Sequence, residues 1–309
     1  MDNEFLLMDR LQKIRQIIRK YGEENFYLSF SGGKDSTVLS ALLDMAIPNN
    51  KIPRVYANTG IEYRLILEFV ERERERPHPW ELIILKPKIP IKPMLEEEGY
   101  PLKSKMHSKI LGEYQRLGNC KTVVKYLGNS VDGESFRSTF LVCPQILKYQ
   151  FSEDFKIKVS DKCCLRMKEK PLTEWAKANS RTYFISGITR AEGGRRFRAE
   201  CLVFENEKLK AFQPLAPITE DWEDWFIETY NIEISEIYKP PYNFTRTGCK
   251  GCPFAIELQQ ELDTLERFFP AERKQCEIIW KPIYDEYRRI GYRLRPLDEG
   301  RQMTLEEFQ

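Results

Sequence analysis

The stretch that decides the fold is Phe26-Tyr27-Leu28-Ser29-Phe30-Ser31-Gly32-Gly33-Lys34-Asp35-Ser36-Thr37. An apolar run rich in aromatic residues ends in Ser-Gly-Gly-Lys-Asp-Ser, and an Ala- and Leu-rich segment follows at 38–46. This order predicts a strand, a tight loop and a helix. Two glycines let the backbone bend toward a ligand, and the first N–H groups of the helix favour an anion. The stretch therefore predicts a phosphate-binding loop made of Ser31, Gly32, Gly33, Lys34, Asp35 and Ser36.

The composition is that of a globular protein. Of 309 residues, 41% are apolar and 31% charged, which allows one large domain or two modest ones. No run of 18 apolar residues predicts a membrane span, and the acidic start lacks the pattern of a signal peptide, so we expect a cytoplasmic protein. Eight cysteines then indicate thiol or metal chemistry. A net charge of only +2 does not indicate strong overall attraction to nucleic acid.

Helical and strand patterns alternate along much of the chain. We expect helices at 4–20, 62–76 and 171–178 and strands at 54–57, 81–85 and 182–186, in addition to the opening strand. Such alternation predicts an α/β, Rossmann-like parallel sheet with helices on both faces. Ligands of these sheets lie beyond the carboxyl ends of the strands. The phosphate loop and Asn58, Thr59 and Gly60 should therefore share one edge.

Four segments are expected. Residues 1–98 form the first half of the α/β domain, 99–160 an insertion or lid, 161–255 the rest of the domain with its cysteines, and 256–309 the C-terminal helices. A hairpin turn is expected at 204–209, a helix after Thr219, and two closing helices at 254–268 and 271–289. The insertion shows little periodicity. Its basic, tyrosine-bearing part at 100–127 is either an ordinary solvated surface or a contact for a polyanion.

Four of the cysteines form a pair of pairs. Cys249 and Cys252 flank Lys250-Gly251 in a metal-knuckle pattern, and Cys163 and Cys164 are adjacent. Four thiolates suit zinc or an iron–sulfur cluster. Neighbouring side chains diverge, which is awkward for a single tetrahedral ion but acceptable for a cluster with several irons. Four unlinked buried thiols are the structural alternative.

Several motifs together resemble one family. The order Ser-Gly-Gly-x-Asp-Ser, distinct from the Walker loop, resembles the pyrophosphate loop (PP-loop) of ATP pyrophosphatases and of phosphoadenylyl-sulfate (PAPS) and adenylyl-sulfate (APS) reductases, the adenine nucleotide alpha-hydrolase-like superfamily. Lys162 to Leu172 resembles the Cys-Cys-x-x-Arg-Lys-x-x-Pro-Leu signature of assimilatory adenylyl-sulfate reductases, with Met167-Lys168 in place of Arg-Lys. Residues 56–63, 186–196 and 212–217 also match family segments, so the resemblance covers roughly 20–95 and 160–255.

The resemblance implies roles for particular residues. The two cysteine pairs would hold a 4Fe-4S cluster, with zinc as the alternative, and Asn58, Thr59 and Gly60 would contact the nucleotide. Planar guanidinium groups clamp phosphate or sulfate oxygens in pairs, so Arg190, with Arg195 or Arg196, would hold the transferred group. The residues expected to carry the chemistry are Lys34, Asp35 and Arg190.

Two reactions remain open at this stage. A reductase would bind PAPS or APS and use a thiol reductant, but the family's cysteine-bearing tail is not found; Cys276 lies in a predicted helix interior. An ATP pyrophosphatase would use Mg²⁺ with Asp35 and Lys34 to adenylate an acceptor for sulfur transfer, and the basic segment 100–127 would contact a nucleic-acid acceptor. A non-catalytic nucleotide-binding module is the third possibility. His78 and His107 are expected at the surface.

Overall fold

The computed structural model describes residues 3–128, 142–191 and 194–296 and divides into two compact units. The first, here called the sheet unit, comprises residues 1–87 and 167–247. The second, the helical unit, comprises residues 88–166 and 248–309. Each unit is thus assembled from two separate stretches of the chain.

The sheet unit is built on six strands in the order β3-β2-β1-β4-β6-β5. They are β1 (Phe26–Phe30), β2 (Arg54–Ala57), β3 (Leu82–Leu85), β4 (Tyr183–Ile185), β5 (Leu202–Glu205) and β6 (Lys208–Phe212). Every pairing is parallel except that of β5 with β6, which forms the predicted hairpin. The predicted α/β, Rossmann-like architecture is confirmed, and β1 lies between β2 and β4.

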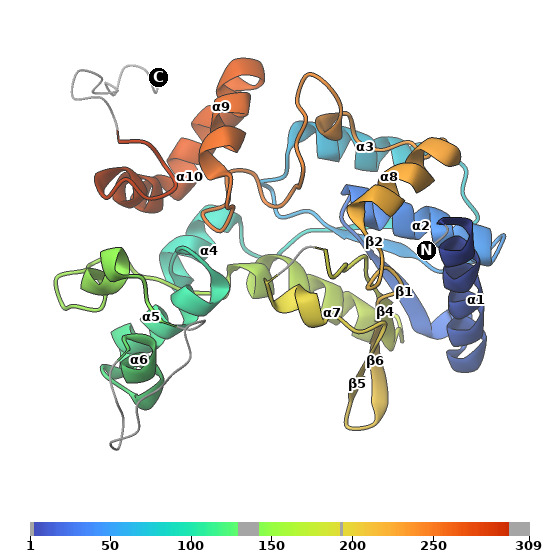
Figure 1. Cartoon of the computed structure of the whole chain (residues 1–309), viewed down its shortest axis with the longest axis horizontal. Helices are drawn as coiled ribbons and strands as arrows, with labels where there is room; N and C mark the ends of the chain where they lie inside the picture. The colour runs from blue at the N-terminus through green and yellow to red at the C-terminus, as the bar shows by residue number, and fades with distance from the viewer. Residues whose placement is uncertain (1–2, 129–141, 192–193, 297–309) are drawn as a thin grey trace. The chain divides into compact units, whose positions relative to one another are not determined.

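Helices cover both sides of this sheet. Helix α7 (Lys170–Ala178) packs Ala176 against Tyr27 and Val55 on one face. Helices α2 (Lys34–Ala46) and α8 (Glu220–Thr229) lie on the other side (Figure 1). Helix α1 (Asn3–Tyr21) packs beside α2, and α3 (Arg64–Glu75) connects β2 to β3. The predicted amphipathic stripe of α1 is confirmed, since its apolar residues recur at helical spacing and are buried.

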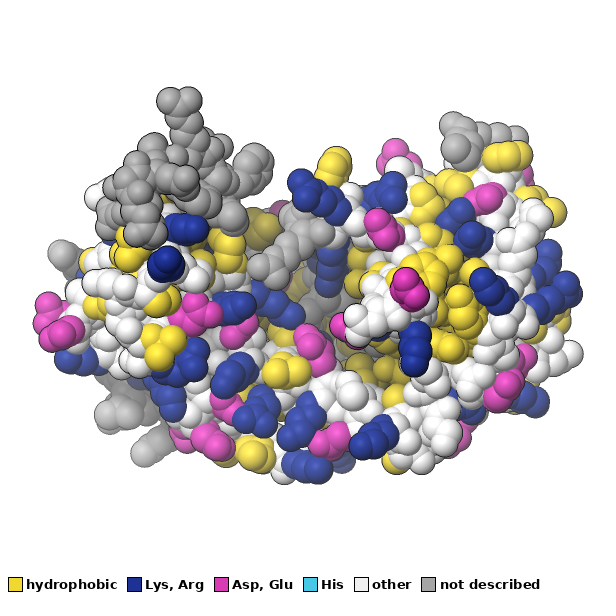
Figure 2. Space-filling model, turned by 90° about the horizontal axis from the view of Figure 1, so that it is seen from below, with side chains coloured by type: hydrophobic (Ala, Val, Ile, Leu, Met, Phe, Trp, Pro, Cys, Tyr) yellow, Lys and Arg dark blue, Asp and Glu magenta, His cyan; other side chains and the backbone are white. Residues whose placement is uncertain are grey.

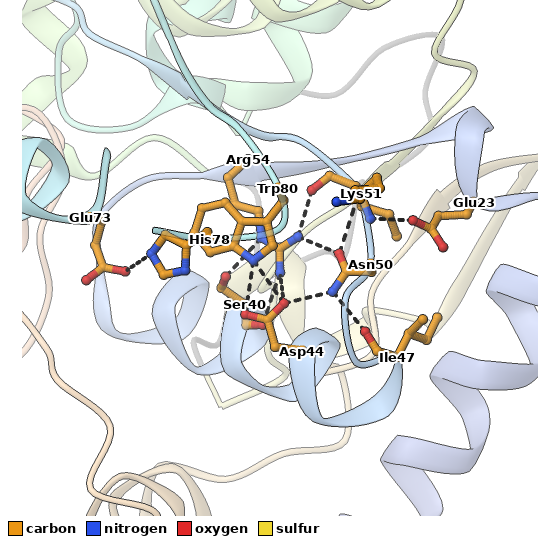
Figure 3. A network of polar contacts seen from close by, with 11 residues as sticks. Glu23, Ser40, Asp44, Ile47, Asn50, Lys51, Arg54, Glu73, His78 and Trp80 are labelled. Atoms are coloured by element: carbon orange, nitrogen blue, oxygen red, sulfur yellow. Dashed lines mark hydrogen bonds and ion pairs between the residues drawn. The ribbon is translucent and has the colours of Figure 1, made fainter. Parts of the chain in front are cut away.

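A fully buried arginine joins the sheet to α2 (Figure 3). The Arg54 guanidinium donates to Ser40 Oγ at 3.0 Å, to Asn50 Oδ1 at 2.8 Å and to Asp44 Oδ1 at 2.7 Å. It also lies over the Trp80 ring, 4.2 Å from the centroid, and Trp80 Nε1 donates to Asp44. A buried charge is tolerated only when it is paired and hydrogen-bonded, and this network meets that requirement. Desolvation nevertheless lowers the pKa of Arg54 to about 10.

The helical unit contains α4 (Ile91–Glu98), α5 (Lys105–Leu117), α6 (Lys121–Tyr126), α9 (Leu258–Phe268) and α10 (Pro270–Arg289). Helices α5 and α6 lie in the segment that showed little periodicity in the sequence. Ile110 and Val123 from these helices join Leu147 in a core cluster. Ser104 caps α5 by accepting from the backbone N–H of His107 at 3.2 Å. Within the described residues, no helix is long and apolar enough to cross a membrane.

The expectation of two surface histidines is wrong for His107 and only partly met for His78. His107 is fully buried, with Nδ1 2.9 Å from Tyr126 Oη and Nε2 2.9 Å from Gln150 Oε1. Burial lowers the pKa of His107 to about 4, so it is neutral at physiological pH. His78 is half-buried and stacks on Trp80 at 3.9 Å. Both side chains serve packing.

Candidate functional site

The predicted phosphate loop leaves the carboxyl end of β1 and enters α2 at Lys34. Gly32 has a φ of +69°, and a Cβ there would lie 2.7 Å from Val70 Cγ2 of α3. Only glycine fits, because both the backbone conformation and the approach of α3 exclude a side chain. The core of the sheet unit therefore sets the path of the loop.

Hydroxyl groups brace the loop from within. Ser31 Oγ lies 3.0 Å from Ser36 Oγ and accepts from the Gly33 N–H at 3.2 Å. Ser36 Oγ and Thr37 Oγ1 both donate to the Gly33 carbonyl, at 3.0 and 2.9 Å. These hydroxyls hold the backbone in shape and occupy the N–H groups of Ser31 and Gly33, so the other loop N–H groups and the Lys34 ammonium are the ones that could meet an anion.

The first turn of α2 carries charges that face α8. Lys34 Nζ lies 3.1 Å from Asp224 Oδ1. Asp35 lies near Glu223, and burial together with the charge of Asp35 raises the pKa of Glu223 to about 8. Burial raises the pKa of Asp35, while the charges of Lys34 and Arg246 oppose that rise. After β4, Gly187 lies close to the same turn, since a Cβ there would be 3.0 Å from the Asp35 carbonyl oxygen. A compact ionisable cluster thus adjoins the loop.

The second predicted contact follows β2, the strand paired with β1. Asn58 Oδ1 accepts from the Gly60 N–H at 2.9 Å, and Thr59 Oγ1 donates to Glu62 Oε1 at 2.8 Å. Lys168 Nζ lies 3.7 Å from the same Glu62 oxygen. Because β1 and β2 are parallel, this turn and the phosphate loop lie at the same edge of the sheet, as the alternation predicted.

The predicted arginines lie between β4 and β5. Arg190 is exposed, its Nε donates to the Ala199 carbonyl at 2.7 Å, and its backbone N–H donates to Ala216 at 3.1 Å. Arg196 is exposed in the short 3-10 helix Gly194–Arg198. The side chain of Arg195 lies outside the described residues. Arg190 is therefore held in place by its own turn, and its role as a clamp stays a prediction.

All four predicted metal-binding cysteines belong to the helical unit. A helix begins at Cys163 and Cys164, and its next turn, Leu165–Glu169, is π-helical. Single π-helical turns are often found at functional sites. Burial raises the pKa of Cys252 well above its usual value, and the thiols of Cys249, Cys164 and Cys163 raise it further. In the part of the chain that the structure describes, no three His, Cys, Asp or Glu side chains are arranged to hold a metal ion. Cys163, Cys164 and Cys249 are thus near enough to raise the pKa of Cys252, but the four thiols are not in a ligating arrangement.

Side chains of helix α10 donate hydrogen bonds to the backbone carbonyl groups of the knuckle at Cys249–Cys252. Trp280 Nε1 donates to the Lys250 carbonyl at 3.0 Å, Tyr284 to that of Gly251, and Tyr287 to that of Pro253 at 2.9 Å. Lys250 Nζ is buried and lies 2.6 Å from Glu272 Oε2. Gly251 has a φ of +61°, and a Cβ there would lie 2.8 Å from Cys276 Sγ. The backbone of the knuckle is fixed by its own unit.

Cys276 is a packing residue in this arrangement. Its side chain is fully buried in α10 against Gly251, and burial raises its pKa to about 12. A reactive cysteine requires exposure and a lowered pKa, and Cys276 has neither.

Comparisons with known proteins bear on the first half of the chain. Residues 25–130 match the family described as phosphoadenosine phosphosulfate reductase domain. The predicted family resemblance is confirmed over about a third of the chain. No curated protein matches the sequence.

Solved structures give distant similarities. A phosphoadenylyl-sulfate reductase from Candida auris, in a phosphate complex, is 10% identical with a TM-score of 0.42, over 77% of this chain and 93% of the other. An NH3-dependent NAD synthetase from Campylobacter jejuni is 13% identical (TM-score 0.43; 96% and 100% of the two chains). A U34-tRNA thiolase from Methanococcus maripaludis, solved with its 4Fe-4S cluster, is 17% identical (TM-score 0.39; 97% and 84%).

Sequence analysis did not find the partners of the loop on α8. Glu223 and Asp224 lie in a segment whose aromatic residues indicated a core helix. The sequence did hold a signal for Glu223. It directly follows the core residue Trp222 and is buried with it, and an acidic residue is unusual at a buried position. Tyr238 was also missed, although its hydroxyl would lie 3.2 Å from a Cβ on Gly33 of the loop and pairs with Thr247.

Proposed function

We propose that this protein is an enzyme of sulfur metabolism that binds an adenine nucleotide at the loop between β1 and α2. The observation that carries the proposal is the loop itself. It is a Ser-Gly-Gly-Lys-Asp-Ser turn braced by its own hydroxyls at the carboxyl edge of a parallel sheet. The family match, which includes this loop, supports a nucleotide of the adenylyl-sulfate or ATP type.

In the proposed complex, the loop N–H groups and Lys34 would bind phosphate oxygens, and Asp35 would meet the Mg²⁺ that accompanies ATP. Asn58, Thr59 and Gly60 lie at the same edge and would contact the nucleoside. Arg190 and Arg196 would clamp the transferred group, since exposed guanidinium groups bind paired oxygens. The ion pair between Lys34 and Asp224 is weak, because Asp224 is largely exposed to water. A phosphate could therefore compete with Asp224 for the Lys34 ammonium.

We further propose that Cys163, Cys164, Cys249 and Cys252 hold a 4Fe-4S cluster. Four soft thiol donors in one unit, three of which raise the pKa of the fourth, Cys252, fit such a group. When bound, the cluster would supply a thiolate-ligated iron centre for sulfur chemistry. Before it binds, the four thiols must lose their protons and come closer together, which their mutual repulsion opposes.

Of the two open reactions, adenylation has the better structural support. Outside the four-cysteine set, Cys143 and Cys276 are buried and Cys120 and Cys201 half-buried, and burial raises the pKa of Cys143, Cys201 and Cys276. These thiols are poorly suited to attack sulfur. In adenylation, an acceptor atom instead bonds to the α-phosphorus of ATP, the bond to the bridging oxygen breaks, and pyrophosphate leaves. Reduction of an adenylylated sulfate remains the second candidate, favoured by the family match.

A nucleic acid is the proposed acceptor. The basic residues Lys105, Lys109, Arg116, Lys121 and Lys125 of α5 and α6 are exposed. Elsewhere charge of both signs is mixed, as Figure 2 shows for the face seen from below, in accord with the net charge of +2. Contact with a polyanion would therefore be local and strongly dependent on salt.

A paired assay tests the proposal. Protein reconstituted with iron and sulfide under anaerobic conditions is incubated either with ATP and Mg²⁺ or with adenylyl sulfate and a thiol. Release of pyrophosphate supports adenylation, and release of sulfite supports reduction. If neither product forms and Lys34→Ala binds ATP as well as the unchanged protein does, the proposed function is wrong.

A further inference from the structure

A short segment of the sheet unit exposes an aromatic ring to solvent. Phe197 lies in the 3-10 helix Gly194–Arg198 and is 72% exposed, more than any other aromatic side chain that the structure describes. Single exposed apolar residues are common on protein surfaces and need no function. Phe197, however, lies between two exposed arginines in the chain, Arg196 and Arg198. Its ring therefore belongs to a cationic surface.

The segment that bears Phe197 lies at the carboxyl edge of the sheet. Strand β6 is parallel to β4, and β4 is parallel to β1, so the carboxyl ends of all three strands share one edge. The Gln213 N–H, directly after β6, donates to the Cys201 carbonyl at 2.7 Å, which places the end of the segment at that edge. Arg190 Nε donates to the Ala199 carbonyl at 2.7 Å and ties the segment to the turn after β4. Phe197 is therefore at the edge that holds the phosphate loop.

The order of the strands separates this ring from the predicted nucleoside contacts. Asn58, Thr59 and Gly60 follow β2, which lies on one side of β1, whereas β4, β6 and β5 lie in that order on the other side. At about 4.8 Å per strand, β5 is about 14 Å from β1. An adenine at the turn after β2 is thus on the far side of the phosphate loop from Phe197. The side on which Phe197 lies is left for the acceptor.

The residue types of the segment match one kind of ligand. A phenylalanine ring stacks on flat π-systems, and every nucleobase has a π-face. Guanidinium groups bind phosphate oxygens in pairs. Residues 194–201 include three arginines and one acidic residue, Glu200, so the segment carries net positive charge. Bases in a duplex are already stacked on one another, so only an unpaired base is open to the ring.

We propose that Phe197 stacks on an unpaired base of the nucleic-acid acceptor while Arg198 contacts a neighbouring phosphate. The inference rests on the proposed function, because it takes the acceptor to be a nucleic acid. It deepens that function in one respect: the acceptor is single-stranded where it meets the sheet unit, as in a loop, a bulge or an opened duplex. No bond forms or breaks at the ring, which holds the strand beside the phosphate loop.

Fluorescence anisotropy with a labelled single strand of about 12 nucleotides, as RNA and as DNA, tests the proposal. Phe197→Ala should bind about tenfold more weakly than the unchanged protein, because one base loses its stacking partner. Phe197→Tyr keeps the ring and should bind within about twofold of the unchanged protein, whereas Phe197→Leu keeps only apolar surface and should bind about as weakly as the alanine variant. Phe5→Ala, which removes an exposed ring from α1, is the control.

Salt dependence and duplex binding separate the ring from the arginine. Each phosphate contact with a single strand contributes about 0.7 to the slope of log K against log salt. Phe197→Ala should leave this slope unchanged, while Arg198→Ala should reduce it by about 0.7. The duplex form of the same sequence should bind equally to Phe197→Ala and to the unchanged protein, because its bases are paired.

The inference is overturned if Phe197→Ala binds the single strand as tightly as the unchanged protein, or loses affinity equally for the duplex. It is also overturned if Phe197→Leu binds normally, as an apolar contact with a protein partner would require. Calorimetry with ATP and Mg²⁺ distinguishes the two sources of a base: a tenfold loss of ATP affinity in Phe197→Ala would assign the ring to adenine instead.

The same measurements separate this inference from the proposed function. If the unchanged protein binds ATP but neither single strand at low salt, the acceptor is not a nucleic acid and the stacking role fails, while the nucleotide site stands. If the protein binds the single strand but not ATP, the nucleotide site fails, and the four Phe197 and Phe5 variants still decide whether the ring stacks on a base.

Discussion

The phosphate loop and the cysteine knuckle are two loops prepared to different degrees. In the loop, serine and threonine hydroxyls hydrogen-bond to the N–H and carbonyl groups of Gly33 and keep the backbone in shape without a ligand. In the knuckle, α10 fixes the carbonyl groups, yet the four thiols are not in a ligating arrangement within the described chain. Neutral dipoles can be organised in advance at little cost, whereas thiolates repel one another until a metal is present.

The largest expected effect would break the knuckle side of this comparison. Cys249→Ser should abolish the cluster in anaerobically reconstituted protein, because a serine hydroxyl is a much poorer ligand for iron. Iron and sulfide analysis with the visible spectrum measures the loss. Cys201→Ser in the sheet unit is the control and should keep the brown colour. A colourless protein that carries one zinc would contradict the iron assignment.

The next effect concerns the support beneath the loop. Asp44→Ala leaves the guanidinium of Arg54 buried without its counter-charge and should destabilise the protein by about 3 kcal/mol. This is the low end of the range for buried pairs, because Asp44 is 38% exposed and partly screened by water. Chemical denaturation measures the change. Glu71→Ala, at a partly exposed position on α3, should change stability by less than about 0.5 kcal/mol, and an equal loss in both variants would dismiss the role of the network.

A smaller effect probes the loop directly. Lys34→Ala should weaken ATP binding about tenfold to a hundredfold, since one charge-assisted hydrogen bond contributes about 1.5–3 kcal/mol. The iron content should not change, because Lys34 and the four cysteines belong to different units. Titration calorimetry measures binding, with Lys20→Ala on α1 as the control. Unaltered affinity would show that the prepared loop is not the binding site.

The smallest expected effect concerns the hydrogen bonds from α10 that hold the backbone of the knuckle. Tyr284→Phe removes one hydrogen bond to Gly251 and keeps the packing, so the loss of stability should be about 1 kcal/mol. Because the knuckle backbone then holds its shape less firmly, reconstitution should be slower than in the unchanged protein. The time course of cluster absorbance measures this. An identical time course would indicate that the thiols alone determine assembly.

The parts of the fold that sequence analysis predicted are those with a local signal. The strand, loop and helix at 26–46 carry their own pattern, and α8 begins where Thr219 caps it, accepting from the Trp222 N–H at 3.3 Å. Helices α5 and α6 were not predicted, because their apolar residues pack against Leu147 and Cys143 from another segment, and no local pattern reveals such contacts.

Buried charge was equally hidden from sequence analysis. Arg54 was assigned to a strand, but its burial depends on Asp44 and Trp80, one before it and one after it in the chain. The raised pKa of Glu223 likewise depends on Asp35, which is nearly two hundred residues away in the chain. The residue types of the candidate site could be found from motifs; the groups that set their protonation required the folded structure.

The contact between Gly32 and Val70 has a consequence for genetics. A methyl group of a core valine on α3 lies 2.7 Å from where a Cβ of Gly32 would stand, so repacking that valine would move the loop. A substitution such as Val70→Leu would be recorded in a phenotypic screen as a defect in using nucleotide, although the valine is buried and need never touch one. Alleles at this position would imitate mutations of the loop, and suppressors would arise among the apolar neighbours of α3.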